Sequence, residues 1–491
     1  MKSKLSRFDS IRRLWSGLGG IVIVLLAAGL AQPALCGPVY GLNESSDGCK
    51  NGSGGADPAG GQGGPGCSSC SSGGAGGPDC CNGVPVWSVS EPYINVWVYD
   101  EPLGYQPGLG SHISFKLAYK QRDFYTRSLS TSFFSLGTNW NCSWLSYIID
   151  GGSSAIATQI LPLGGQRTNF PDNSTREYFS RSTWQRTTAL GIFTGYILSN
   201  VDGSVDYYQL VPGIPPIDNL AFLTAKVDAA GNTTTFIYNQ TPSLVTLAQV
   251  IDADGHTNTL SYANTSFPGQ ITGVQDAFGR STTLAYDAYG NLTNVTDVSG
   301  LSSSFAYDGE CWITNLTTPY GTTTLSHYTN DSGYYSSYGE FWCEEPYGAC
   351  THSNYVIRSV KVVDPVGGTN IYMLRQNSTN LYIPPVVWPS GGPIANLDIP
   401  VSGNDYRTYR DTFFWGPRQS QGSPLDPETF TPSDYDKARV RHWLHDPTIK
   451  IITQTLSYEQ LPSPDGVTVT GRIKMYHPRS NQNVPPRAGL I

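Results

Sequence analysis

The sequence predicts an all-β protein in which an N-terminal β domain is followed by stacked two-stranded repeats that form a continuous curved sheet, a partial β-shell. Two observations predict this class. Only 14% of the 491 residues are charged, with 54 Gly and 30 Tyr against 3 Met, which favours strands and turns over helices. An internal repeat of 21 to 24 residues also runs from residue 228 to 328, as expected of a stacked array.

Residues 1–36 are predicted to be a secretory signal peptide. Basic side chains between Lys2 and Arg13 precede an apolar run from Leu18 to Ala31, and small residues follow, which is the order of an export signal. Cleavage after Ala31 and after Cys36 are both acceptable. A membrane anchor is the alternative, but the run is shorter than the roughly 20 residues that a span needs. We therefore expect a secreted or cell-surface protein with no stable membrane span after cleavage.

The charge of the exported chain excludes one class of partner. Removal of residues 1–31 deletes five basic side chains and one acidic one, which changes the formal net charge from −8 to −12. An acidic protein without a basic stripe is not expected to bind nucleic acid.

Residues 37–83 are predicted to be a flexible linker rich in Gly, Ser and Cys. They contain almost no large apolar side chain, so burial cannot offset the entropy of ordering them. We expect disulfides here because exported proteins retain them. A zinc site is the alternative, and the Gly-rich surroundings disfavour it. The ten cysteines leave the pairing open: Cys36, Cys49, Cys67, Cys70, Cys80, Cys81, Cys142, Cys311, Cys343 and Cys350.

Residues 84–215 are predicted to form the N-terminal β domain, with eight to ten strands. Short runs rich in β-branched and aromatic residues alternate with Gly, Pro and Asp. Examples are INVWVY (94–99), ISFKLAY (113–119) and SWLSYII (143–149).

Residues 216–375 are predicted to form the repeat sheet. DAAGNTTTFIY (228–238), DADGHTNTLSY (252–262), DAFGRSTTLAY (276–286) and DVSGLSSSFAY (297–307) share an Asp, a Gly three residues later and a Tyr seven after that. TPYGTTTLSHY (318–328) keeps the Gly and the Tyr but begins with Thr318. Asp caps a tight turn through its side chain and Gly supplies a positive φ. The predicted structural residues of the repeats are Asp228, Gly231, Tyr238, Asp252, Gly255, Tyr262, Asp276, Gly279, Tyr286, Gly290, Asp297, Gly300, Tyr307, Gly321 and Tyr328.

Each turn should lead into a half-buried strand, because apolar and small polar residues alternate up to the Tyr. In the fifth copy Leu325 comes one position early. A second strand carries apolar residues three apart, such as Leu292 with Val295, which predicts either a bulge or burial of both faces. Two strands are not stable alone, so the copies must stack into one sheet.

Tyr286-Asp287-Ala288-Tyr289-Gly290-Asn291-Leu292 resembles the YD repeats of the Rhs family, in which Tyr-Asp-x-x-Gly precedes Asn or Arg. Gly231-Asn232 and Gly279-Arg280 match the same pattern. The resemblance covers about residues 84–375, and more loosely the Tyr/Trp-rich tail, residues 376–491, which we expect to hold degenerate β repeats.

The resemblance implies a β-shell that encloses a toxin or another C-terminal cargo, or, as in teneurins, a shell used for cell contact. Five clear repeats are fewer than a closed shell needs, and the family's self-cleaving Asp-Pro-x-Gly-Leu motif is missing. We interpret the nearest string, residues 364–368, as a degenerate repeat turn. The chain is thus expected to be a short form or the front part of a longer product.

We predict no catalytic, cofactor-binding or metal-binding residue. His442 and His445 could ligate a metal if they lay on a helix, but no third ligand stands nearby, so we interpret them as surface or packing residues. Asp252-Ala-Asp254-Gly255 lacks the later Glu of a calcium loop. No hydrolase, zinc-protease or phosphate-loop motif appears, so an enzyme, for example a glycoside-active one, is the least favoured class.

The predicted function is that of an exported Rhs-type structural or shell protein without cofactors. Its expected partner is its own or a neighbouring cargo polypeptide, or cell-surface carbohydrate. The alternative is an extracellular carbohydrate-binding or adhesion module that uses exposed Tyr and Trp side chains. That alternative requires an exposed row of aromatic residues on one sheet face.

Overall fold

The fold is that of a computed structural model, and all described residues belong to one compact unit within Cys36–Ile491. The structure describes residues 84–91, 94–121, 132–152, 155–177, 180–211, 220–241, 244–331, 355–377, 410–421, 429–430, 434, 437–445, 454–462 and 469–475. The predicted signal peptide and the predicted linker, with their cysteines, and also Cys343 and Cys350 lie outside these residues.

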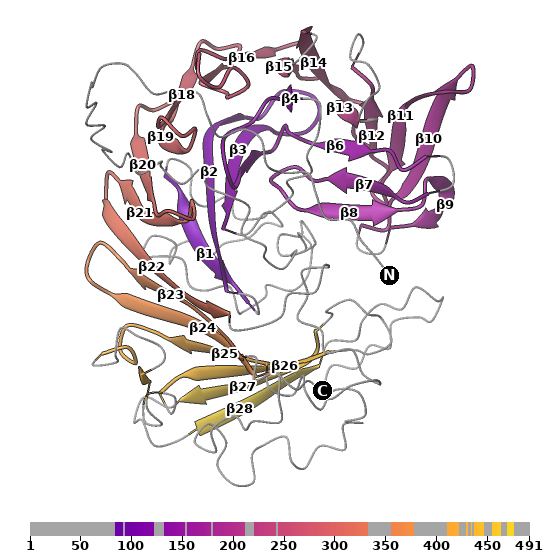
Figure 1. The fold of residues 1–491 in the computed structure, drawn as a ribbon. Coiled ribbons are helices and arrows are strands. Elements are labelled where there is room, and N and C mark those ends of the chain that lie inside the picture. The colour runs from indigo at the N-terminus through magenta and orange to yellow at the C-terminus, as the bar shows by residue number, and fades with distance from the viewer. Residues whose placement is uncertain are drawn as a thin grey trace, which may run out of the picture. The chain divides into compact units, whose positions relative to one another are not determined.

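Every named element in the described residues is a β-strand, which confirms the all-β prediction (Figure 1). No helix in this part of the chain has the length and apolarity needed to cross a membrane. A small antiparallel sheet has the order β1-β2-β3-β5. Its strands are β1 (Val86–Ser90), β2 (Asn95–Tyr105), β3 (Ile113–Lys120) and β5 (Trp140–Cys142).

The large sheet is a continuous antiparallel meander from β9 to β28, in which each strand pairs with the next along the chain. Its strands are β9 (Asp172–Arg176), β10 (Thr183–Ala189), β11 (Ile192–Ser199), β12 (Val205–Gln209), β13 (Leu220–Val227), β14 (Thr233–Thr241), β15 (Leu244–Ile251), β16 (Thr257–Ser261), β17 (Gly273–Gln275), β18 (Ser281–Tyr286), β19 (Leu292–Thr296), β20 (Ser302–Tyr307), β21 (Ile313–Thr318), β22 (Gly321–Asp331), β23 (Tyr355–Val363), β24 (Thr369–Asn377), β25 (Arg410–Trp415), β26 (Arg439–His445), β27 (Gln454–Pro462) and β28 (Val469–Met475).

Four further strands join this sheet from its side. β6 (Tyr147–Ile149) pairs with β13 and leads through β7 (Ala157–Ile160) to β8 (Gln166–Asn169). β4 (Ser132–Phe133) pairs in parallel with β15. Among the described strands β9 pairs only with β10, and β28 only with β27, so the sheet is not closed. The prediction of one continuous repeat sheet is confirmed.

The strands predicted at 94–99 and 113–119 correspond to β2 and β3. In the predicted strand 143–149, only β6 is extended, because Leu145 donates its N–H to the Cys142 carbonyl (3.2 Å) and turns the chain. The strands β6 to β12 of the predicted N-terminal domain belong to the same sheet as the repeats. Strand pairing does not test the predicted domain boundary at residue 215, which stays a prediction.

The three-residue spacing of apolar residues is explained by a bulge in three copies, as one of the two predicted alternatives requires. In β19, Leu292 pairs with Tyr286 and Asn294 pairs with Ala285, so Thr293 is the extra residue. Similar register shifts occur between β14 and β15 and between β20 and β21. Because of the bulge, both Leu292 and Val295 are buried.

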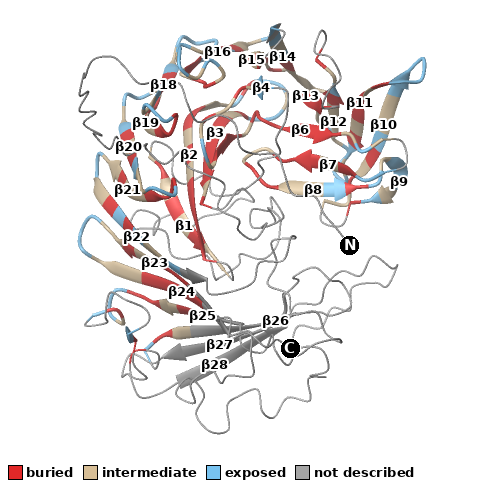
Figure 2. Cartoon of the chain, viewed as in Figure 1, coloured by how far each residue is buried: buried red, intermediate tan, exposed pale blue. Residues whose placement is uncertain are grey.

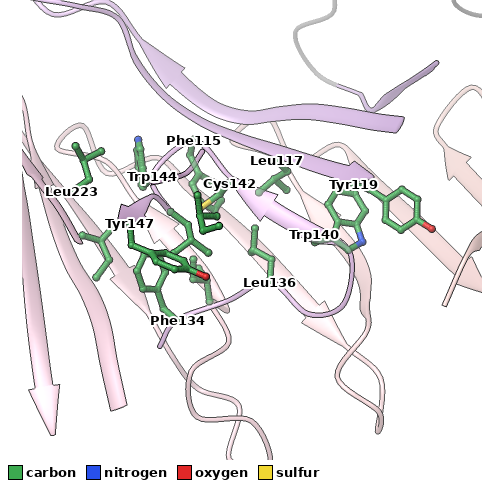
Figure 3. Packing of buried hydrophobic residues seen from close by; sticks show 14 of the residues in the cluster. Phe115, Leu117, Tyr119, Phe134, Leu136, Trp140, Cys142, Trp144, Tyr147 and Leu223 are labelled. Carbon is green, nitrogen blue, oxygen red and sulfur yellow. The ribbon is translucent and has the colours of Figure 1, made fainter. Parts of the chain in front are cut away.

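The core between the two sheets is continuous (Figure 2). Phe115, Leu117 and Tyr119 of β3, Trp140 of β5 and Leu223 of the large sheet all belong to it, with Leu223 and Tyr119 at opposite ends of the cluster in Figure 3. Cys142 also lies there as a free thiol, and burial raises its pKa to about 12. A second, smaller core forms around β24 and β25. Its buried residues are Ile371, Met373, Phe413, Trp415, Phe430 and Ala438.

Candidate functional site: the repeat turns and their clasp

The turns of the repeats share one hydrogen-bond geometry. At Asp276 the backbone N–H donates to the Arg280 carbonyl (2.9 Å), and Gly279 donates its N–H to the Asp276 carbonyl (3.2 Å). Asp276 Oδ1 accepts the N–H groups of Phe278 and Arg280, both at 2.9 Å. The same four bonds occur in the turns that begin at Asp228, Asp252, Asp287, Asp297, Asp308 and Asp364. The interpretation of residues 364–368 as a repeat turn is therefore confirmed.

The predicted glycines lie in the left-handed region of backbone conformation, which a side chain resists. Their φ angles are 89° at Gly231, 86° at Gly255, 78° at Gly279, 85° at Gly290 and 82° at Gly300. In the Asp308 turn, Cys311 occupies this place with φ 59°. The Thr318 turn differs, because Thr318 pairs directly with Gly321 across a two-residue loop.

In the turns that begin at Asp228, Asp252, Asp276 and Asp287, the residue after the glycine has a role that the sequence did not reveal. Its side chain donates to the second oxygen of the Asp, as Arg280 Nε does to Asp276 Oδ2 at 2.7 Å. Asn232, His256 and Asn291 make the corresponding contacts at 2.9 to 3.0 Å. The Asn or Arg of the repeat pattern therefore completes the cap of the turn.

The repeat tyrosines form a ladder in which each hydroxyl donates to a backbone carbonyl 15 residues earlier. The bonds are Tyr238 to Leu223 (2.7 Å), Tyr262 to Leu247 (2.8 Å), Tyr286 to Ile271 (2.5 Å), and Tyr307 to Leu292. Burial raises the pKa of all four phenols, so each stays protonated and able to donate.

The fifth copy continues the ladder with a different residue. Here His327 Nε2 donates to the Ile313 carbonyl at 2.7 Å, and its Nδ1 accepts from Gln121 Nε2 at 3.2 Å. Tyr328, which the repeat pattern placed in this role, packs against the second core instead. The early position of Leu325 in the sequence signalled the change of phase, but nothing in it pointed to His327.

The end of β2 and the loop that follows it reach three turns on one side of the large sheet, where successive strands end. We call residues 102–110 the clasp. Tyr105 donates its hydroxyl to Asp252 Oδ2 (3.0 Å), and the N–H groups of Gly108 and Leu109 donate to Asp254 Oδ2 at 2.6 and 3.2 Å. The Tyr105 ring also meets Phe278 edge to face at 5.1 Å. Burial, followed by the Asp252 carboxylate, raises the pKa of Tyr105 to about 12.

The clasp also contacts the next two turns on this side, which begin at Asp276 and Asp297. The Gly104 carbonyl accepts a bond from Arg280 Nη2 at 3.1 Å, and the Pro102 carbonyl accepts the N–H of Val298 at 3.1 Å. At the other ends of the repeat strands, Tyr119 donates its hydroxyl to the Cys311 carbonyl (3.2 Å) and Trp140 Nε1 donates to the Tyr307 hydroxyl (2.9 Å). The small sheet is thus hydrogen-bonded to the repeats at both ends of their strands.

The described residues show no cluster of three or more side chains that could hold a metal ion. His442 and His445 lie on strand β26, so the helical condition for a metal pair is not met. A cavity of about 290 Å³ lies beside the β23–β24 turn, and its lining includes Lys361, Val366 and Ser420. The polar side chains of the repeats serve turns, ladder and clasp, so this arrangement is chemically suited to holding a sheet together.

Comparison with known proteins identifies the repeat. The RHS Repeat family model matches residues 269–300 and 286–323, which contain the Asp276, Asp287, Asp297 and Asp308 turns. These residues of the chain are RHS repeats. The Asp-capped turn and the tyrosine ladder are therefore the structural content of its RHS repeats. No match is found among curated proteins.

Solved structures similar to this RHS-repeat protein include the Tc holotoxin pore of Photorhabdus luminescens with a TccC3 variant, at 10% identity and a TM-score of 0.21. That match covers 80% of this chain and 23% of the other. The TcdB2-TccC3-TEV structure gives the same values. TcdB2-TccC3-Cdc42 matches at 10% identity and a TM-score of 0.16, covering 80% and 24%. The RHS-repeat protein thus spans about a quarter of the length of the chains it matches.

Proposed function

We propose that this RHS-repeat protein is an exported structural protein whose sheet forms part of a shell around a polypeptide cargo. The observation that carries the proposal is the uninterrupted sheet from β9 to β28, whose two end strands each pair with one neighbour only in the described residues. Such an end strand presents backbone groups to which further strands can add. The cargo is either a later part of the same polypeptide or the product of a neighbouring gene.

The use of the repeat side chains supports a structural role. The positions that recur from copy to copy of the repeat point their polar atoms at backbone groups of the same sheet, as Tyr262 and Asp276 do. The ladder tyrosines are not a free aromatic row. The exposed aromatic residues among the described repeats are single turn residues, namely Phe278, Tyr289 and Tyr320. Nothing in these residues favours carbohydrate binding over the shell.

Export is supported by the signal-like N-terminus and by the acidic mature charge. The test is the mass of the N-terminal peptide of protein recovered from the culture medium or cell surface. A mature chain that starts at residue 32 or 37 is expected. Recovery of the chain only from the cytosol, with Met1 retained, would contradict export.

The shell role is tested by protection of a cargo from protease. The full chain is co-expressed with the polypeptide encoded directly downstream, and the mixture is treated with proteinase K before and after the chain is denatured. We expect the cargo to survive only while the chain is folded. Digestion of the cargo at the same rate with and without the chain would show that the sheet does not enclose it.

A further inference from the structure

A buried carboxyl group lies where the clasp meets the Asp297 turn. Asp100 pairs with Leu117 of β3, and the register then shifts until Leu103 pairs with Phe115. This bulge brings residues 100–102 to the repeats, where the Pro102 carbonyl accepts the N–H of Val298 at 3.1 Å. Asp100 is 7% exposed, and its Oδ1 makes no hydrogen bond.

The Asp297 turn offers Asp100 no compensating charge. Asp297 is also 7% exposed, and its Oδ1 accepts the N–H groups of Ser299 (2.7 Å) and Leu301 (2.8 Å). In the Asp276 turn the residue four positions after the Asp is Arg280, whose guanidinium pairs with Asp276 Oδ2. The Asp297 turn has Leu301 at that place, which has no donor in its side chain.

The other charged groups near Asp100 are occupied elsewhere. Glu101 is paired with His112 (3.0 Å) and Lys116 (3.3 Å). Arg280 is held by Asp276 and by the Gly104 carbonyl. The charges that act on Asp100 are the carboxylates of Asp297 and Glu101. Burial, with these two charges in addition, outweighs a hydrogen bond from the Glu101 backbone and raises the pKa of Asp100 to about 7.

We propose that the junction of the clasp with the Asp297 turn is a proton-binding site, in which a proton on Asp100 holds the clasp closed and its loss loosens it. An ionised Asp100 would be a buried charge beside a second carboxylate, offset only in part by the Glu101 backbone hydrogen bond, and such a charge is costly unless it is neutralised. Opening the clasp hydrates both groups and removes that cost. The exported chain would therefore hold its small sheet more firmly in an acidic medium, whether or not it carries a cargo.

The direction of the pH effect follows from the raised pKa. The folded chain takes up a proton that the unfolded chain has lost above about pH 4, so the stabilising effect is present in acid and is lost as pH rises from about 4 to about 7. For the full chain we expect the melting temperature to fall by about 5 °C more between pH 5 and pH 8 than in the Asp100→Asn variant. Hydrogen exchange in residues 97–106, corrected for the intrinsic pH dependence, should accelerate over the same range.

Two further variants separate this site from a general charge effect. Asp297→Asn removes the neighbouring carboxylate and can still accept the two turn N–H groups. It should lower the pKa of Asp100, so that the loss of stability between pH 5 and pH 8 becomes smaller and ends at lower pH. Its matched control is Asp308→Asn, because Asp308 makes the same turn bonds at the other ends of the repeat strands, away from the clasp. The control should keep the transition of the unmodified chain.

The proposal is overturned if Asp100→Asn and the unmodified chain lose stability in parallel between pH 5 and pH 8. It is also overturned if Asp297→Asn and Asp308→Asn behave alike. If Asp100→Asn does not fold, the Asp297→Asn comparison alone decides. A further measurement at pH 8 uses CaCl₂ with the unmodified chain: no change is expected, and restoration of the acid melting temperature would mean that a cation, and not a proton, neutralises the site.

Discussion

The glycine of the repeat turn is required by backbone conformation and not by lack of space. At Gly279, φ is 78° and an added Cβ would meet no atom within 4 Å. The left-handed region is disfavoured for residues with a Cβ, most of all for β-branched ones. Cys311 adopts this conformation in the Asp308 turn, so the geometry tolerates a side chain at an energetic cost.

Gly279→Val should therefore lower the free energy of unfolding by about 1 to 3 kcal/mol, because Val must adopt a strained φ. Gly309→Val is the matched control: Gly309 also lies in a repeat turn with open space around it, but its φ is outside the left-handed region. Urea denaturation of both variants measures the difference. Equal stability would show that the Gly279 turn can adopt an ordinary conformation.

Each hydroxyl of the tyrosine ladder is also expected to contribute to the stability of the sheet through a single local hydrogen bond. Tyr286→Phe deletes the donor to the Ile271 carbonyl, at 2.5 Å, and leaves the rest of the ring in place. We expect a loss of about 1 kcal/mol, the usual net effect of one hydrogen bond. Tyr289→Phe, at an exposed turn position, should change the urea midpoint little. If the two variants had the same midpoint, the ladder bond would contribute nothing to stability.

At the scale of the elements, the sequence predicts what repeats locally and misses what joins distant segments. Asp, Gly and Tyr recur every 21 to 24 residues, and this spacing predicts the turns and strands. The clasp bond from Tyr105 to Asp252 joins residues 147 apart, and no periodicity marks it. The fit of the clasp depends on one register shift in β2, which sequence pattern does not determine.

Asp254 offers a test of the clasp that leaves its turn intact, because its side chain accepts the clasp N–H groups of Gly108 and Leu109, whereas the turn is capped by Asp252. Asp254→Ala should increase hydrogen exchange of residues 101–112 about tenfold, since bonds to a charged acceptor are the stronger ones. Glu310 occupies the same turn position outside the clasp and is exposed, so Glu310→Ala is the control. Unchanged exchange in Asp254→Ala would mean that the clasp is held by its other contacts.

At the scale of the whole molecule, two cores divide the large sheet. The first spans the small sheet and β10 to β24, and the second centres on Trp415. Trp415 stacks on Phe413 at 5.9 Å, meets Phe430 at 5.1 Å, and donates from Nε1 to the Asp434 carbonyl at 2.7 Å. In the described residues around the second core, β24 and β25 pair only with the strands next to them along the chain, and such a sheet transmits a local defect weakly. We therefore expect the two cores to open separately.

Trp415→Ala tests this division, because truncation of a buried Trp typically costs about 3 to 5 kcal/mol. Hydrogen exchange should rise in residues 371–374 and 410–415, while residues 281–307 of the tyrosine ladder keep their protection. Trp140→Ala, in the first core, should show the reverse pattern, since Trp140 donates to Tyr307 and packs on Phe305 at 4.9 Å. Faster exchange throughout the sheet in both variants would make it one cooperative unit. A change at either end would then weaken every repeat, and the sheet could not open at one end while the rest stayed closed.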